Sequence, residues 1–237
     1  MEKVKQHFEE EAQEFDAIIQ RLIPYYEQML DAIFLTLPFK QSHPIDVIDL
    51  GCGTGTIARR IKNVYPQARI TCVDIAEKML NIAQTKLGNS GDVRYQLENF
   101  EDYEFDSAYD IAVSSLALHH LVSEDDKIKF YKKIYSCLKS GGVFYNADVI
   151  LGSSSHLQKR YMEKWREYMR LQVSEEEIEQ KWIPLHYDED HPSKLINQLD
   201  WLQDIGFTEV DVVWKYYNFA VYGGRKSTES QISAPEL

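Results

Sequence analysis

The chain has 237 residues, of which 44% are hydrophobic and 27% are charged. No apolar run approaches the roughly 20 residues that a membrane-spanning helix needs, so the composition favours a soluble globular protein with no membrane partner. Asp and Glu outnumber Lys and Arg by 38 to 26. The resulting formal charge of −12 disfavours nucleic acid as a partner, because a phosphate backbone would be repelled.

The N-terminal segment and the cysteine content bear on the cellular compartment. The segment MEKVKQHFEEEAQEFD lacks the apolar core of a secretory signal. The three cysteines, Cys52, Cys72 and Cys137, are too few for a disulfide framework. We therefore expect a protein of the reducing cytoplasm, and the sequence leaves a homodimer possible.

Residues 1–40 carry no strand signal. Apolar side chains recur at helical intervals from Phe8 to Ile33, and Pro24 marks a break between helices. We expect these helices to form an N-terminal cap on the domain that follows.

Residues 41–152 alternate short β-branched runs with longer amphipathic stretches, which is typical of a parallel sheet built from strand–helix–strand units. The expected strands are Ile45–Leu50, Arg69–Asp74, Asp92–Leu97, Tyr109–Ser115 and Gly142–Ile150. Before the last of these strands we expect a helix that Ser123 caps, that has acidic residues in its first turn, and that ends at Gly141.

Residues 153–206 predict a helical lid over the sheet. Its helices are expected around the stripe from Leu157 to Met169, over Glu175–Lys181, and from Ser193 to Gly206, where glycine ends the helix. The acidic run from Tyr187 to Asp190 is most simply a solvated loop, and the alternative is that it attracts a cationic acceptor.

The last segments complete the expected fold. Within residues 207–226, the runs Val210–Trp214 and Tyr217–Tyr222 are too close for a helix to join them, so they predict an antiparallel strand pair. The fold class is then α/β, with a doubly wound, seven-stranded, mostly parallel sheet. The polar tail 227–237 is expected to be disordered.

The segment VIDLGCGTGTIARRI joins a strand to a helix through Gly51, Gly53 and Gly55. Glycines let the backbone turn tightly and let a ligand approach the free N–H groups of the helix N-terminus. Asp74 ends the next strand about twenty residues further on, where a carboxylate can bind both hydroxyls of a ribose. Asp49 directly precedes the turn, where a carboxylate would repel a pyrophosphate but suit an ammonium group. A nucleoside joined to an amino acid indicates S-adenosylmethionine.

The motifs DLGCGTG, VDIAEKML, YQLENF and YDIAVSSLALHHL follow one another in this order. Through them the chain resembles the class I S-adenosylmethionine-dependent methyltransferases. The resemblance implies a Rossmann-like fold, S-adenosylmethionine as cofactor, and S-adenosylhomocysteine as product. The cofactor-binding residues that it implies are Asp49, Gly51, Gly53 and Gly55 at the methionine end, Asp74 at the ribose with Ile75 and Met79 after it, Asn99 and Phe100 at the adenine, and Ser114 and Ser115 beneath the methionine. Asn99 stands where the family commonly has Asp.

The flanks FDAIIQRLIPYYEQML, SEEEIEQKWIPLHYDEDHPSKL and YYNFAVYGG resemble the carboxy-S-adenosylmethionine synthases, which make a carboxylated cofactor for tRNA wobble-uridine modification. This resemblance places Tyr26 at the cofactor. In that group an Arg follows the Gln-Lys pair and binds the extra carboxylate, whereas Trp182 follows Gln180 and Lys181 here. Loss of that partner would cost about 2–5 kcal/mol. We therefore expect methyl transfer to a small-molecule acceptor, with such a synthase and a non-catalytic cofactor-binding scaffold as the alternatives.

Three residues at the carboxyl edge of the sheet are candidate catalytic residues. His119 and His120 follow the fourth expected strand, and Asp148 lies at the end of the fifth. A histidine there could touch the acceptor or pack under the next helix, and Asp148 could act as a base, orient a histidine or cap a turn. The trio also has the chemistry of a divalent-metal site. Because adjacent histidines on an extended segment point to opposite faces, we predict no metal ligands.

Aromatic residues are concentrated in the segments that flank the sheet domain. A few of them facing the cofactor would form an apolar pocket for a small acceptor and exclude water from the transfer. The candidates among these flanking aromatic residues are Tyr25, Tyr26, Tyr161, Trp165, Trp182, Tyr187, Trp201, Trp214, Tyr216 and Tyr217.

Overall fold

The computed structural model describes residues 2–228, so most of the tail for which we predicted disorder lies outside the described residues. One seven-stranded sheet has the strand order β3-β2-β1-β4-β5-β7-β6. Its strands are β1 (Asp46–Leu50), β2 (Arg69–Asp74), β3 (Val93–Leu97), β4 (Tyr109–Ser115), β5 (Leu138–Val149), β6 (Phe207–Tyr216) and β7 (Phe219–Lys226). The first five pair in parallel, and β7 pairs antiparallel with both β5 and β6. The predicted doubly wound α/β sheet is confirmed.

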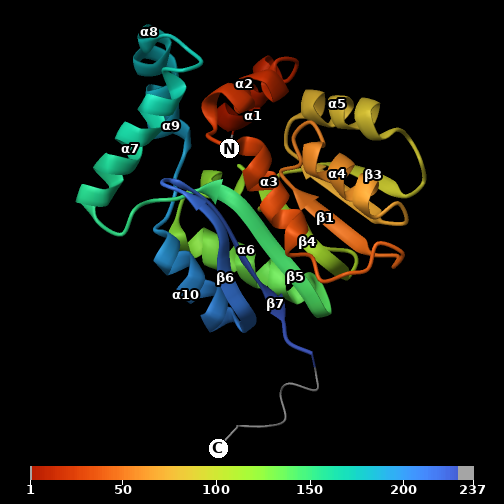
Figure 1. Ribbon diagram of the computed structural model, residues 1–237. Coiled ribbons are helices and arrows are strands. Elements are labelled where there is room, and N and C mark those ends of the chain that lie inside the picture. The colour runs from red at the N-terminus through yellow and green to blue at the C-terminus, as the bar shows by residue number, and fades with distance from the viewer. Residues whose placement is uncertain (1, 229–237) are drawn as a thin grey trace, which may run out of the picture.

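Helices cover both faces of this sheet (Figure 1). Helices α3, α4 and α5 pack on one face, and α6 and α10 pack on the other. The helices are α1 (Glu2–Glu11), α2 (Phe15–Leu22), α3 (Tyr26–Leu35), α4 (Thr56–Val64), α5 (Glu77–Leu87), α6 (Glu124–Cys137), α7 (Ser155–Met169), α8 (Glu175–Glu177), α9 (Ile183–Glu189) and α10 (Leu195–Ile205), with a 3₁₀ turn η1 (Leu118–His120) and a π-helical turn η2 (Ile178–Trp182). None of the described helices is both long and apolar enough to cross a membrane.

The central strands are apolar throughout because both of their faces are covered. Along β1, Val47 packs in the core under α3 and α4, while Ile48 and Leu50 pack in the core under α6. Successive side chains of a strand point to opposite faces, so a strand buried on both sides becomes a continuous apolar run. Asp49 interrupts this run, and its burial within the sheet core therefore requires a separate explanation.

The helix before β5 is shorter than the sequence suggested. Ser123 caps α6 as predicted, since its Oγ accepts a hydrogen bond from the Asp126 backbone N–H at 3.1 Å. The helix ends at Cys137 rather than near Gly141, because Leu138 already pairs with Tyr109 in the sheet. The helical spacing of Leu138 was therefore misleading: this side chain is buried as part of a strand.

The lid departs from the sequence prediction at two places. Tyr187–Glu189 is the end of α9 rather than a solvated loop. Helix α10 begins at Leu195, and Ser193 does not cap it: Ser193 is buried, and its carbonyl accepts a hydrogen bond from the Leu151 N–H at 3.0 Å. Gly206 ends α10 in the left-handed conformation, as predicted.

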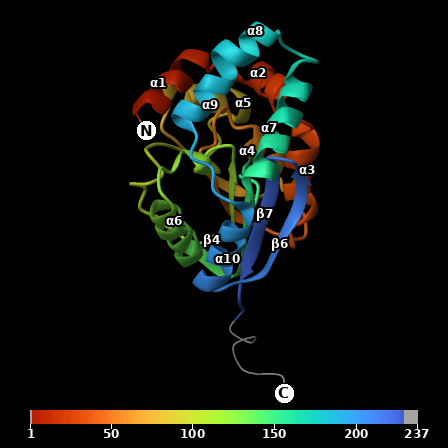
Figure 2. The ribbon, with the colours of Figure 1, turned by 90° about the vertical axis from the view of Figure 1, so that its left-hand side faces the viewer.

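The strand order reverses between β1 and β4, and ligands of open α/β sheets bind at such a point, beyond the carboxyl ends of the strands. The cap helices α1 and α2 and the lid helices α7 to α9 lie beyond this edge (Figure 1). Figure 2 shows α1 next to α9 over the same edge, so two segments that contact each other across 182 residues of sequence lie side by side there.

Candidate active site

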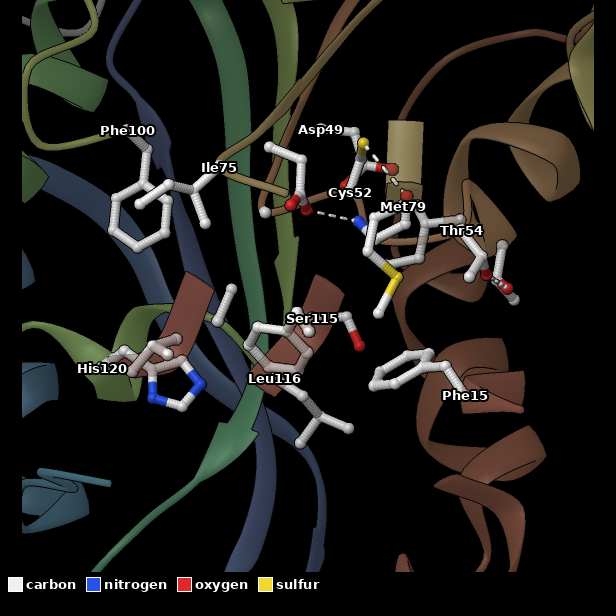
Figure 3. A pocket seen from close by; sticks show the side chains of 18 of the residues that line it. Phe15, Asp49, Cys52, Thr54, Ile75, Met79, Phe100, Ser115, Leu116 and His120 are labelled. Atoms are coloured by element: carbon white, nitrogen blue, oxygen red, sulfur yellow. Dashed lines mark hydrogen bonds between the residues drawn. The ribbon is translucent and has the colours of Figure 1, made fainter. Parts of the chain in front are cut away.

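A pocket opens at the carboxyl ends of β1, β2 and β4. Nine of the twelve predicted cofactor residues line it: Tyr26, Asp49, Gly51, Gly53, Asp74, Ile75, Met79, Phe100 and Ser115. In the view of Figure 3, Asp49 and Cys52 lie on one side of the pocket, and Leu116 and Phe15 lie on the other. We refer to this space as the cofactor pocket.

The other three predicted residues do not line the cofactor pocket. Gly55 begins α4 at φ +78°, and a Cβ on it would lie 2.9 Å from the Ala83 Cβ of α5. Ser114 is buried and donates a hydrogen bond from its Oγ to the Leu50 carbonyl at 2.7 Å, which ties β4 to β1. The Asn99 amide donates to the Glu101 carboxylate at 3.3 Å. Their contacts in the structure are therefore with the protein itself.

Asp49 lies at the base of the cofactor pocket with an unsatisfied oxygen. Its side chain is 1% exposed, and Oδ2 has no hydrogen-bond partner among the described residues. Burial raises the pKa of Asp49 to about 7. A buried carboxylate without a cation is costly, so this position fits a positively charged ligand group such as an ammonium.

Asp74 organises the glycine-rich turn. Its two oxygens accept hydrogen bonds from the Gly53 N–H at 2.8 Å and from the Ala76 N–H at 2.9 Å. Burial raises the pKa of Asp74 to about 6, against these stabilising bonds. Each oxygen retains a second lone pair, so the carboxylate can also accept hydrogen bonds from a ligand diol.

Gly51 is required by the close approach of two loops. It adopts φ +68°, and a Cβ there would lie 2.3 Å from the Ala117 Cβ. A side chain at this position would clash with the segment after β4 and would demand a conformation that side-chain-bearing residues rarely adopt. The turn is therefore kept open by the glycine and can admit a ligand against its backbone.

The cap helices supply cofactor-pocket residues that the sequence did not assign. Phe8 of α1 and Phe15 of α2 line the pocket and meet edge to face, with ring centroids 5.9 Å apart. Phe8 also contacts the His120 ring at 5.7 Å. The apolar spacing of the first 40 residues predicted helices, but nothing local in that spacing showed which rings face the sheet edge.

A second pocket adjoins the first and shares its wall of Phe8, Phe15, Leu116 and His120. Apolar residues of α2 and the rings of Trp165, Trp182 and Phe219 form most of its surface. Besides His120, its polar residues are His7, Glu11, His119, His186, Glu189 and Asp190. None of the described residues that line it is Lys or Arg. We call this space the acceptor pocket, after the small-molecule acceptor that the sequence predicts.

The structure brings His119 and His120 together. They lie on the turn η1, and their ring centroids are 4.1 Å apart. The expectation that they point to opposite faces was wrong, because the segment is a 3₁₀ turn and not an extended strand. Both side chains are buried and both line the acceptor pocket.

His119 lies between two carboxylates. Its Nδ1 is 2.5 Å from Asp148 Oδ1, and its Nε2 is 3.3 Å from Asp190 Oδ1. Burial opposes protonation, but the charges of Asp148 and Asp190 outweigh it and raise the pKa of His119 to about 10. Asp148 is held in turn by the Asn146 amide at 3.1 Å. In this state His119 is a cation with both nitrogens engaged.

His120 is neutral, in contrast to the cationic His119. Burial, followed by the charge of His119, lowers the pKa of His120 to about 3. Its Nδ1 donates a hydrogen bond to the Glu189 carbonyl at 3.1 Å, which leaves Nε2 as the unprotonated nitrogen. His120 lines both pockets, so this neutral histidine is the candidate catalytic residue at their boundary.

The acidic run that we expected to be a solvated loop turns partly inward. Asp190 Oδ2 is 2.7 Å from His186 Nδ1, and its neighbours His119 and His186 hold the pKa of Asp190 well below its usual range despite burial. Glu189 is buried, and its Oε2 is 2.8 Å from His7 Nδ1. Only Tyr187 and Asp188 of this run are exposed.

Comparisons with known proteins agree with this geometry. Residues 47–142 match a family model described as a methyltransferase domain. A carboxy-S-adenosyl-L-methionine synthase of Helicobacter pylori (strain HPAG1) is 30% identical over 226 residues, covering 92% of this chain and 93% of that protein. One of Nautilia profundicola is 27% identical over 223 residues, covering 94% of each chain.

Solved structures share the fold at low identity. The complex of DhpI with SAH has a TM-score of 0.63 and 18% identity, and the match covers 94% of each chain. Human N-acetylserotonin methyltransferase in complex with SAM has a TM-score of 0.61 and 17% identity, with 94% of this chain matching 57% of that one. With the relatives above, these matches show that the chain belongs to the class I S-adenosylmethionine-dependent methyltransferase family and takes S-adenosylmethionine as its cofactor.

Proposed function

We propose that this protein transfers a methyl group from S-adenosylmethionine to a small-molecule acceptor and releases S-adenosylhomocysteine. The observation that carries the proposal is the pair of adjoining pockets with one shared wall. A donor in the cofactor pocket and an acceptor in the acceptor pocket would meet at that wall. Holding two reactants in such a geometry supplies much of the rate acceleration of a direct displacement.

Residues of the sheet edge would hold the cofactor. Asp49 would accept hydrogen bonds from its ammonium group, and Asp74 would accept them from its ribose hydroxyls. When bound, S-adenosylmethionine supplies an electrophilic methyl group on a sulfonium. The rings of Phe8 and Phe15 close the space from the cap side and exclude water from it.

The acceptor pocket suits a small molecule with an apolar body. Trp165, Trp182 and Phe219 surround it, and the histidines and carboxylates occupy its polar side. His120 is the residue that we expect to touch the acceptor, because it lies at the boundary of the two pockets. His119 and Asp148 would act as positioning residues that fix the turn on which His120 lies.

Each segment of the chain would have its own role in this function. We propose residues 1–40 as a cap and residues 153–206 as a lid, which together enclose the acceptor. Residues 41–152 would bind the cofactor, and residues 207–226 would complete the sheet. Contacts of α1 with α9 and η2 support this division, since they join cap and lid directly above the pockets.

Calorimetric titration with S-adenosylmethionine tests the first half of the proposal, and the absence of saturable heat at millimolar cofactor would contradict it. A screen of small alcohols, phenols, amines and thiols, read out as S-adenosylhomocysteine formed, tests the second half. Cofactor binding without turnover of any acceptor would instead favour the non-catalytic scaffold.

The names of the relatives favour a second candidate, carboxy-S-adenosylmethionine synthesis. Against it, Trp182 is buried in the acceptor pocket and donates its indole N–H to Glu177 at 2.9 Å. A carboxylated cofactor would find no Lys or Arg among the described lining residues of that pocket, and it would face the carboxylates of Glu11 and Glu189. Mass spectrometry of cofactor copurified with the protein, and incubation with prephenate, would reveal a carboxylated product if this candidate is correct.

A further inference from the structure

Three side chains converge on one point in the wall of the acceptor pocket. They are His119 and His120 of η1 and Asp190, which follows α9 about 70 residues later in the chain. One nitrogen of each histidine and one oxygen of the carboxylate all lie within 4.8 Å of one another. The lid therefore adds a carboxylate, Asp190, to the two histidines that the sheet domain provides.

The separations of Asp190 from the two histidine nitrogens fit a first-row divalent ion. Asp190 Oδ1 is 3.3 Å from His119 Nε2 and 3.6 Å from His120 Nδ1. Ligands about 2.0–2.1 Å from a tetrahedral ion are about 3.3–3.4 Å apart from one another. The two separations from Asp190 therefore suit one ion bound by all three side chains.

The groups behind two of the three ligands, His119 and Asp190, resemble the outer shell of a metal site. Asp148 binds the far nitrogen of His119, at 2.5 Å from Nδ1, and so directs Nε2 toward Asp190. His186 Nδ1 is 2.7 Å from the other oxygen of Asp190. A carboxylate behind a ligating histidine fixes the ring orientation and raises its basicity.

We propose that His119 Nε2, His120 Nδ1 and Asp190 Oδ1 bind one divalent ion of the Zn²⁺ class. Two nitrogen donors and one oxygen favour Zn²⁺, Co²⁺ or Fe²⁺ over Mg²⁺ and Ca²⁺, which prefer oxygen. On binding, His119 Nε2 releases its proton to solvent and the proton of His120 moves from Nδ1 to Nε2, so that His120 exchanges its hydrogen bond to the Glu189 carbonyl for the bond to the ion. Three protein ligands leave a further coordination position, which is typical of catalytic sites.

The open position gives the ion a function in the acceptor pocket, which all three ligands line. There the ion would bind an oxygen, nitrogen or sulfur of the acceptor and hold it beside the cofactor pocket. This role rests on the proposed function, whereas the binding of the ion does not. The proposal narrows the acceptor to a molecule with a metal-binding heteroatom.

The experiment measures metal binding by the full chain, produced without a polyhistidine tag and stripped with dipicolinate. We expect Zn²⁺ titration against a chromophoric chelator to give one site per chain, and Co²⁺ to give the visible absorption of a four-coordinate ion. His120→Ala and Asp190→Asn should each weaken Zn²⁺ binding by more than about 100-fold, and Asp148→Asn by about 10- to 100-fold.

His7→Gln is the matched control, because His7 lies in the same pocket and also binds Glu189. It should leave Zn²⁺ affinity unchanged. The proposal is overturned if the unsubstituted protein shows no saturable site, or if folded His120→Ala and Asp190→Asn proteins bind Zn²⁺ as tightly as it does. Because S-adenosylmethionine binding is measured separately, loss of the metal site and loss of the proposed function remain distinguishable.

Discussion

Two buried acids of this site differ in whether the protein itself supplies their partners. Asp190 has His119 and His186 within ion-pair distance, and its pKa is held low. Asp49 has a bare oxygen, and burial raises its pKa to about 7. A paired buried charge stabilises a fold only modestly, whereas an unpaired one is kept at the expense of stability. The unpaired oxygen of Asp49 is therefore the feature on which we base its proposed role in binding the cofactor ammonium group.

Asp49→Asn should weaken S-adenosylmethionine binding by about 10- to 100-fold, because a charge-assisted hydrogen bond to the ammonium is lost. The same substitution should stabilise the ligand-free protein by about 1–3 kcal/mol at pH 8, since no carboxylate is then buried without a partner. Calorimetry measures the first effect and urea unfolding the second. Equal stability of the two proteins at pH 8 would contradict this account.

The pH dependence of stability should carry the signature of Asp49. Its folded pKa of about 7 lies above the unfolded value near 3.8, so the folded state holds the proton more tightly. The contribution of this proton to the free energy of unfolding is fully present below about pH 4 and is lost as pH rises through 7. The melting temperature of the ligand-free protein should fall between pH 5 and about pH 8, and Asp49→Asn should flatten that fall. Asp74, with a raised pKa of about 6, contributes in the same direction in both proteins.

Asp74→Ala should weaken cofactor binding by about 1–3 kcal/mol, because the ribose loses its acceptor and the turn loses its bond to the Gly53 N–H. Calorimetric titration measures the change. Asp92→Ala is the matched control, since Asp92 is a carboxylate near the start of β3, at the opposite edge of the sheet, and pairs with Lys62. Unchanged affinity in Asp74→Ala would mean that the ribose lies elsewhere.

At the scale of elements, the two helical blocks contact each other as well as the sheet. His7 and Glu11 of α1 contact Glu189 of α9 and Lys181 of η2. Trp165 of α7 donates its indole N–H to the Leu22 carbonyl of α2 at 2.8 Å. Cap and lid thus form one cover over the acceptor pocket, although the residues in contact lie 143 to 182 positions apart in the sequence.

Helix α6 provides a test of element stability away from the pockets. Ser123→Ala removes the oxygen that accepts the Asp126 N–H, and it should lower the free energy of unfolding by about 0.5–2 kcal/mol. Urea denaturation measures this loss. Ser153→Ala, in the exposed segment before α7, should change stability little. A similar loss in both variants would show that the cap contributes nothing specific.

At the scale of the whole molecule, the cofactor pocket is closed only when sheet edge and cap are together. Phe8 and Phe15 belong to the cap, whereas Asp49 and Asp74 belong to the sheet. A ligand that contacts both should stabilise their association. Binding should therefore be detected in α1 and α2 as well as in the glycine-rich turn.

Hydrogen–deuterium exchange tests this coupling. S-adenosylhomocysteine should slow exchange in α1, in α2 and in the turn around Gly51, and it should leave α6 and α10 on the sheet face unaffected. Protection restricted to the turn, with no change in α1 or α2, would contradict a shared closure.

The sequence by itself determined the sheet and the edge of the sheet that lines the cofactor pocket. Each strand, the turn from Gly51 to Gly55 and the acids Asp49 and Asp74 lie in continuous segments, and their conformation follows from alternation, glycine and helix-start signals over a few residues. The predicted boundaries of the elements were wrong where strand pairing overrode the local pattern. Leu138 has helical spacing, but it pairs with Tyr109 in the sheet.

Only the tertiary structure decided how the second pocket is built. Asp190 joins His119 and His120, and Glu189 joins His7, because the folded lid returns across the sheet edge to meet η1 and α1. No short-range pattern encodes such meetings, since they depend on how helices pack over the sheet. The local sequence therefore specified the sheet edge at which we propose that the cofactor binds, and packing between distant segments specified the pocket beside it.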